Sequence, residues 1–114
     1  MADPRISVTV STPRFAEYQR KVDSALERVI VKYTLIVERR VKRTIAVDTG
    51  RLRSSVRTSL EKLVGWIFTD VNYAAYVEFG TWKMSAQPAW VPVMERIRLP
   101  FIKACVDAIK GVRL

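Results

Sequence analysis

Apolar and polar residues alternate along the first part of the chain and then change to a helical spacing. Between Arg5 and Val10 every second residue is a branched aliphatic side chain, which predicts a strand with one buried face. From Phe15 to Val41 the apolar residues recur every three or four positions, which predicts one amphipathic helix that ends near Ala46. A helix of about thirty residues spans roughly 45 Å. Such a length is typical either of a partner surface or of a helix that crosses a small sheet and projects from it.

A tight turn separates this helix from a predicted hairpin. Residues 47–50, Val-Asp-Thr-Gly, join a capping aspartate to a glycine that permits a sharp reversal, and residues 51–55 are expected to form a short helical turn. Alternation over 56–61 predicts a second strand. The apolar run 63–71 predicts a third strand, covered on both faces and with a bulge at Gly65. Because these two strands follow each other directly, we expect them to pair as a hairpin.

The last apolar pattern, from Trp90 to Val112, again has helical spacing. Pro100 lies within it, and a proline costs a helix interior about 3 kcal/mol because it removes a hydrogen bond and clashes with the preceding turn. We therefore expect a C-terminal helix that is kinked or broken at Pro100. The elements together predict an α+β fold, in which a small three-stranded, mainly antiparallel sheet packs against the long N-terminal helix and the C-terminal helix.

An aromatic segment lies between the hairpin and the last helix. Residues 71–84 read V-N-Y-A-A-Y-V-E-F-G-T-W-K-M. Asn72 is expected to cap a short helical turn, and Gly80 to end it in a left-handed conformation. The following connection, 81–91, is long and contains two tryptophans and a methionine, residue types that are enriched in the buried centres of protein interfaces. One interpretation is a subunit contact, and the other is a loop that folds back onto its own core.

Charge changes this picture by indicating a partner. The 114 residues carry a formal net charge of +9, with thirteen basic and six acidic residues in positions 1–57 against seven and five in positions 58–114. The densest basic run is interrupted only by Asp48 and comprises Arg39, Arg40, Lys42, Arg43, Arg51, Arg53 and Arg57. Such a cluster is suited to contact nucleic-acid phosphates, although basic residues also favour the C-terminal end of a helix for electrostatic reasons.

The composition disfavours catalysis. The chain has no histidine and one cysteine, and its four glycines are far apart, so it lacks the usual proton shuttle, the usual soft metal ligands and a phosphate-binding glycine loop. The acidic residues are scattered singly, which argues against a magnesium site and against a nuclease, an alternative that magnesium-dependent cleavage would test. Cys105 has the spacing of a small core residue. Neither a secretory signal nor a membrane span is expected.

Three segments, taken together, resemble a known family. They are V-D-T-G-R-L-R-S-S-V at 47–56, V-N-Y-A-A-Y-V-E-F-G-T at 71–81 and K-M-S-A-Q-P-A-W-V-P-V-M at 83–94, in this order after a long amphipathic helix. On these residues the chain is similar to the head-tail joining proteins of long-tailed bacteriophages, also called neck or tail-completion proteins. The resemblance covers most of the chain. The proline at position 100 departs from the uninterrupted C-terminal helix that we expect of this family.

The resemblance implies a small α+β subunit, a single neck or tail-completion domain over residues 1–114, that assembles into a ring in the virion neck. This ring would join the head, through portal adaptor or head-closure proteins, to the tail terminator or tail tube proteins, and double-stranded DNA would pass through its lumen without sequence readout. Sixfold symmetry is expected from the sixfold tails of such phages. The family implies no enzymatic activity, no cofactor, no metal and no membrane. The expected location is the virion neck, with the host cytoplasm during assembly.

The candidate residues fall into groups. The residues that match the family's signature are Asp48, Thr49, Gly50, Leu52, Tyr73, Ala74, Tyr76, Val77, Glu78, Phe79, Gly80 and Thr81, with Ala86-Gln87-Pro88 before the last helix. We assign a turn-forming role to Asp48, Thr49, Gly50 and Gly80. The subunit-interface candidates are Tyr73, Tyr76, Glu78, Phe79, Trp82, Met84 and Trp90. The DNA-channel candidates are the seven basic residues from Arg39 to Arg57.

Two expectations remain open at this level. The carboxylate of Glu78 either pairs with an arginine of the same or an adjacent subunit or is solvated, because burial of an unpaired charge is costly. The alternative function is a free, non-sequence-specific nucleic-acid-binding protein, which would use the same positive charge as an isolated protomer. No helix-turn-helix spacing supports that alternative, and the aromatic segment lies outside the basic cluster.

Overall fold

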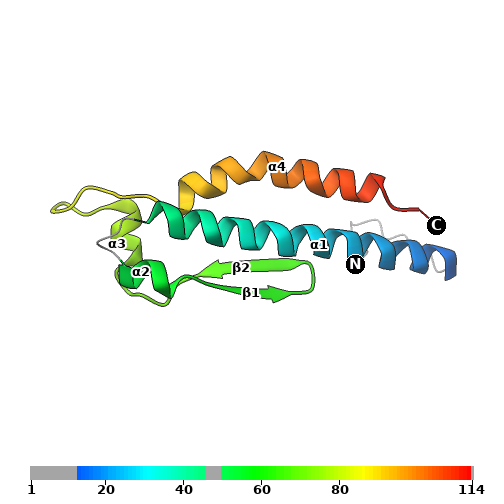
Figure 1. The fold of residues 1–114 in the computed structure, drawn as a ribbon, viewed down its shortest axis with the longest axis horizontal. Coiled ribbons are helices and arrows are strands. Elements are labelled where there is room, and N and C mark those ends of the chain that lie inside the picture. Colours follow the sequence, from blue (N-terminus) through cyan, green and yellow to red (C-terminus); the bar gives the residue numbers. More distant parts are fainter. Residues whose placement is uncertain (1–12, 46–49, 114) are drawn as a thin grey trace, which may run out of the picture.

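The computed structural model describes residues 13–45 and 50–113. Helix α1 lies in the middle of the molecule, with helix α4 along one side and a two-stranded hairpin along the other (Figure 1). The predicted strand Arg5–Val10 and the turn residues Asp48 and Thr49 lie outside the described residues. The elements are α1 Pro13–Thr44, α2 Gly50–Ser55, β1 Arg57–Glu61, β2 Val64–Phe68, α3 Ala74–Phe79 and α4 Trp90–Lys110.

The structure confirms α1 as one long helix of 32 residues. It begins at Pro13, which is suited to a first turn because a proline lacks the N–H that has no partner there. The buried side chains of α1 are Thr34, Val37 and Val41, so only the C-terminal part of the helix carries core residues. The N-terminal part is held by weaker contacts, such as the hydrogen bond from Lys21 Nζ to a backbone oxygen of α4's C-terminal extension.

The core is small and lies at one end of the molecule. It forms where the C-terminal part of α1 meets α2 and the first turns of α4, and its buried residues are Val37, Val41, Ile45, Leu52, Val56, Ala89, Val93 and Ile97. Toward the other end, α1 and α4 contact each other through an edge-to-face pair of Tyr33 and Phe101 with ring centroids 5.5 Å apart. The end that contains the core therefore fixes the arrangement of all the elements.

The hairpin is antiparallel and regular. Its register pairs Thr58 with Ile67 and Leu60 with Gly65, and this face of the hairpin lies against α1. At Gly65 an added Cβ would lie 1.9 Å from Thr34 Oγ1. The predicted bulge is therefore wrong, because the glycine instead allows close approach of the helix.

The prediction that β2 is covered on both faces is also wrong. Trp66 and Phe68 point away from α1 and are 53% and 44% exposed. The expectation that both helices pack on the sheet is also wrong. Helix α1 covers one face of the narrow hairpin, while α4 packs against α1 on a different side, so neither helix covers the other face of the hairpin (Figure 1). The observed fold is α+β, with a long N-terminal helix, a two-stranded hairpin and a C-terminal helix packed on the first.

Helix α4 runs unbroken through Pro100, so the alternative of a broken helix is wrong. Its ribbon arches away from α1 near its middle (Figure 1), as expected where a proline removes a backbone hydrogen bond. The hydroxyl group of Tyr33 donates a hydrogen bond to the carbonyl oxygen of Pro100 at 3.4 Å. This contact ties the arched part of α4 to α1.

The molecule is far from spherical. Its radius of gyration is 19.3 Å and its principal extents are 59 × 40 × 22 Å, whereas a compact domain of this length has a radius of gyration of about 13 Å. The accessible surface is 8934 Å², against roughly 6,400 Å² for a compact monomer of this mass. The chain therefore leaves an unusually large area uncovered.

The close approach at Gly65 gives a testable prediction. Gly65→Ala should lower the free energy of unfolding by about 1–3 kcal/mol, because the added methyl group collides with the buried Thr34 side chain. Gly50→Ala is the matched control, since a Cβ there meets no atom within 4 Å. Urea unfolding of both variants and of the double variant Thr34→Ala/Gly65→Ala measures the effect. Equal stability of the two single variants, or no partial rescue in the double variant, would contradict this packing.

Candidate functional site

The site begins where α3 turns into the loop that leads to α4. Helix α3 starts after Tyr73, which occupies the N-cap position predicted for Asn72, and it ends at Gly80. Gly80 has φ 78° and ψ 173°, a backbone region that is essentially restricted to glycine. The predicted end of the helix at Gly80 is confirmed and its φ is positive, but its ψ lies outside the left-handed helical region, so that part of the prediction is wrong. An added Cβ would lie 2.8 Å from Ala86 N and 3.0 Å from Met84 O. The glycine thus permits the loop to return close to its own start.

The loop is closed by its own backbone. Thr81 and Met84 exchange two hydrogen bonds, of 2.8 Å and 3.2 Å, and the N–H of Gln87 donates to the carbonyl oxygen of Val77 at 2.8 Å. These bonds hold residues 81–87 against α3 while the loop projects beyond the ends of the helices (Figure 1). The loop is therefore a defined structural element, positioned by contacts within one chain.

Glu78 links α3 to the beginning of α4. Its side chain is buried, at 7% exposure. Oε1 accepts hydrogen bonds from the N–H groups of Ala89 and Trp90 at 2.8 and 3.0 Å, and Oε2 accepts one from Val91 at 2.9 Å. The next residue, Pro92, has no N–H to satisfy. One carboxylate and one proline therefore account for the first four positions of the helix, where an N–H group would otherwise lack a partner.

This arrangement corrects the sequence expectation for Glu78. The carboxylate is not solvated, and no ion pair with an arginine forms within the part of the chain that the structure describes. A negative charge is instead stabilised by the positive end of the α4 helix dipole. The sequence contains only a weak signal that Glu78 caps α4. The helix starts at Ala89, which has no capping side chain, and a proline follows in the first turn.

The hydrogen bonds also set the electrostatics of Glu78. Burial alone raises the pKa of its carboxyl group, but the three backbone N–H donors stabilise the charged form more strongly, and the net effect is a pKa below the ordinary value of 4.5. The carboxylate therefore stays charged at neutral pH and keeps all three bonds. Its place is inside the protomer, so the structure gives it a structural role.

The other interface candidates divide by exposure. Tyr73 and Trp90 are half-buried and pack against the core. Four residues are exposed and form what we call the α3–loop patch: Tyr76, Phe79, Trp82 and Met84, at 59%, 72%, 90% and 39% exposure. Trp82 is almost fully exposed, and the Lys83 ammonium group lies above its ring, 4.7 Å from the ring centroid.

The turn and signature residues serve the core. Leu52 of α2 is 1% exposed, and Ala74 and Val77 of α3 pack against the same cluster. Gly50 is the first residue of α2. These residues fix α2 and α3 to the core, and the signature residue Phe79 at the end of α3 reaches the exposed patch.

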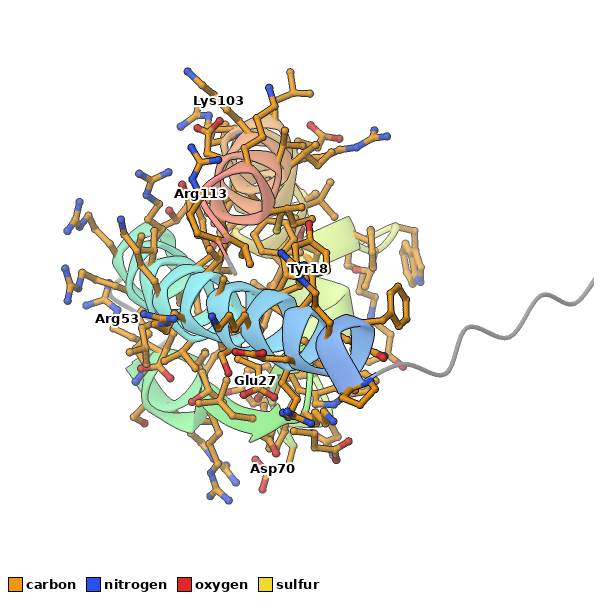
Figure 2. All side chains as sticks on the ribbon, turned by 90° about the vertical axis from the view of Figure 1, so that its right-hand side faces the viewer. Tyr18, Glu27, Arg53, Asp70, Lys103 and Arg113 are labelled. Atoms are coloured by element: carbon orange, nitrogen blue, oxygen red, sulfur yellow. The ribbon has the colours of Figure 1, made fainter. Side chains whose placement is uncertain are left out.

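The basic candidates do not form one uniform surface. Arg39, Arg40, Arg43, Arg51 and Arg57 are exposed. Viewed along α1 from its N-terminal end, nitrogen-tipped side chains gather on the flank of α1 where Arg53 lies (Figure 2). The guanidinium group of Arg53 donates to the carbonyl oxygen of Ile45 at the end of α1, so this arginine braces the helix C-terminus.

Carboxylates partly neutralise two of the basic residues. Lys42 lies 3.6 Å from Glu38, and Arg57 lies 4.0 Å from Asp70. Arg96 of α4, which no pattern in the sequence indicated, lies with Arg40 and Arg43 around a pocket of about 350 Å³. The sequence does not indicate that Arg96 lines this pocket, because its position beside Arg40 and Arg43 depends on how α4 crosses α1.

The described residues offer little for metal chemistry. They contain no group of three or more histidine, cysteine, aspartate or glutamate side chains that could hold a metal ion. Burial raises the pKa of the half-buried Cys105 thiol, which disfavours the reactive thiolate. No helix among them is long and apolar enough to cross a membrane.

The Glu78 contacts predict a pH-dependent loss of stability. Glu78→Gln should lower the free energy of unfolding at neutral pH by about 2 kcal/mol, because it removes charge-assisted hydrogen bonds. Since the pKa of Glu78 is lower in the folded chain than its ordinary value of 4.5, this stabilisation is present above that value and is lost as the pH falls through the folded-state pKa.

Denaturant unfolding of the wild type and Glu78→Gln at several pH values measures this difference, with Glu95→Gln on the exposed surface of α4 as the matched control. We expect the gap between wild type and Glu78→Gln to narrow in acid, whereas Glu95→Gln stays close to the wild type. A gap that is constant across the pH series would contradict the assigned role of the carboxylate.

Comparison with known proteins tests the resemblance. The family model described as bacteriophage HK97-gp10, putative tail-component, matches residues 12–80, which include α1, the hairpin and Glu78 but end before α4. Neither curated proteins nor solved structures give a match. The family is a structural component of the phage tail and neck and not an enzyme. The chain therefore belongs to the HK97-gp10-like family of phage tail components, a head-tail joining and tail-completion family.

Proposed function

We propose that this protein is a structural subunit of the phage neck, which assembles into a ring that joins the head to the tail and surrounds the DNA channel. The observation that carries the proposal is the α3–loop patch. Its aromatic side chains are held outward by bonds within one chain, and such an arrangement suits a contact that is completed by a neighbour. Family membership supports the virion setting.

The energetics favour burial of the patch. Complete burial of one large apolar side chain contributes about 1.5–3 kcal/mol, and Phe79 and Trp82 have most of their surface available for a contact. The loop that carries Trp82 is already fixed by the Thr81–Met84 and Val77–Gln87 hydrogen bonds. Less conformational entropy is therefore lost when a neighbour binds.

A second apolar surface supports a ring. On α4 the exposed residues Leu99, Ile102 and Val106 follow each other at spacings of three and four, so they share one side of the helix. This row lies on α4, whereas the α3–loop patch lies on α3 and the loop after it, and these elements occupy different parts of one elongated subunit (Figure 1). Contacts between two different surfaces are heterologous, and they close into a ring when the rotation between neighbours permits.

The partners follow from this assignment. The ring would contact portal adaptor or head-closure proteins on one side and tail terminator or tail tube proteins on the other, with sixfold symmetry expected. The exposed arginines of α1 and α2 would face the DNA, which they would attract through its phosphates without sequence readout. The protein would act in the virion neck after assembly in the host cytoplasm.

A free nucleic-acid-binding protein is the second candidate. The net charge of +9 and the arginines around the α1–α4 pocket favour it. It differs from the neck subunit in one observable respect, since it would bind DNA as an isolated protomer and would need no ring.

Matched tryptophan substitutions test the neck proposal. Trp82→Ser in the α3–loop patch should weaken self-association by about ten- to a hundredfold, because a buried apolar side chain is lost from each contact. Trp66→Ser on the outer face of the hairpin is the control, since Trp66 is also exposed but lies outside the patch. Light scattering over a range of protein concentrations, alone and with purified neck proteins, measures the mass of the assembly.

The result has two clear contrary outcomes. A wild-type protein that stays monomeric with and without its neck partners would contradict the ring. A Trp82→Ser variant that assembles like the wild type, while circular dichroism shows both variants folded, would exclude the α3–loop patch as the contact.

A further inference from the structure

Three arginines from two helices surround the pocket between α1 and α4. Arg40 and Arg43 are three residues apart on α1 and therefore lie on the same side of that helix. Arg96 reaches the pocket from α4, because its neighbours Val93 and Ile97 are buried in the core. Val93 and Thr44 complete the lining of about 350 Å³. We propose that this pocket binds a phosphate group, and that its source is the backbone of a DNA duplex.

The donors in the pocket suit a phosphate. Each guanidinium group presents several N–H donors in a planar fork, which matches two oxygens of a phosphate at once. The hydroxyl group of Thr44 donates to the carbonyl oxygen of Arg40 at 2.8 Å, so its proton is already used and the arginines supply the donors. The ligand must therefore be an anion that accepts from several directions.

The pocket lacks an internal counter-charge in the described part of the chain. Elsewhere in the basic cluster, Lys42 and Arg57 each lie near a carboxylate. No described carboxylate forms an ion pair with Arg40, Arg43 or Arg96, and none lines the pocket. Three like charges brought together in this way repel one another, and an external anion relieves that repulsion.

The pocket is held in place by the fold. Glu78 fixes the N–H groups at the start of α4, and the buried Val93 and Ile97 lock the next two turns onto α1. Arg96 lies between Val93 and Ile97 in the sequence, so the position of its backbone relative to Arg40 and Arg43 is set before any ligand binds. Such preorganisation lowers the cost of binding.

The choice of DNA as the source of the phosphate rests on the proposed function, whereas recognition of a phosphate group does not. A lumen that guides DNA needs contacts with the backbone and none with the bases, and arginines provide such contacts. The expected binding is independent of sequence and falls as the salt concentration rises.

Two arginines of α4 provide a charge-matched test. Arg96→Gln and Arg98→Gln each remove one positive charge from exposed positions of the same helix, but Arg98 does not line the pocket. Fluorescence anisotropy with a short mixed-sequence DNA duplex should show affinity about five- to tenfold lower for Arg96→Gln and within about twofold of the wild type for Arg98→Gln. The slope of the logarithm of the binding constant against the logarithm of the salt concentration should decrease in magnitude by about one for Arg96→Gln alone.

Inorganic phosphate separates recognition of the group from the general field of the protein. At equal ionic strength, phosphate should displace the duplex from the wild type more effectively than chloride does, and this difference should shrink in Arg96→Gln. Equal effects of Arg96→Gln and Arg98→Gln would overturn the proposal, because the charge would then act only at long range.

Light scattering of the same variants distinguishes this inference from the ring. If Arg96→Gln assembles normally and loses duplex affinity, the pocket contacts phosphate, as proposed. If it keeps duplex affinity but fails to assemble, the pocket binds an acidic group of a protein and the proposal is wrong. If no variant forms a ring but Arg96→Gln alone loses affinity for phosphate, the pocket proposal holds and the neck proposal fails.

Discussion

The hydrogen bonds from the start of α4 to the Glu78 carboxylate are the constraint on which the rest of the structure depends. They join α3 to α4 across a loop that has no other secondary structure, and they satisfy a helix start that has no capping side chain of its own. The direction of α4 along α1, the outward position of the loop and the approach of Arg96 to α1 all follow from this junction. One buried charge thereby organises both candidate surfaces.

The distribution of buried residues explains why the subunit should need neighbours. Among the described residues, the core side chains lie where the C-terminal part of α1 meets α2 and the beginning of α4. The rest of α1 and α4 extends from this core with little burial of its own. An elongated molecule with exposed aromatic residues at its loop and exposed aliphatic residues on α4 resembles one piece of a larger assembly. Association would cover surface that the chain alone leaves in water.

Local patterns in the sequence predicted where the helices and strands lie along the chain better than they predicted which elements contact each other. The period of α1, the hairpin and the end of α3 at Gly80 are local properties, and all three are confirmed. The roles of Gly65 and Glu78 depend on contacts with residues distant along the chain. Gly65 lies against Thr34, and Glu78 accepts hydrogen bonds from the start of α4, and no local pattern in the sequence indicates either contact. The same limit hid Arg96, and it led to the wrong expectation that both faces of β2 are covered.

The most direct test of the central claim is the hydroxyl-radical reactivity of Trp82 in the free protein and in the assembled state, with Trp66 as an internal reference. We predict that Trp82, which is 90% exposed in the protomer, reacts readily when free and becomes strongly protected on assembly, whereas the reactivity of Trp66 changes little. A ring in which Trp82 stays as reactive as in the free protein would contradict the claim that the α3–loop patch is the contact between subunits.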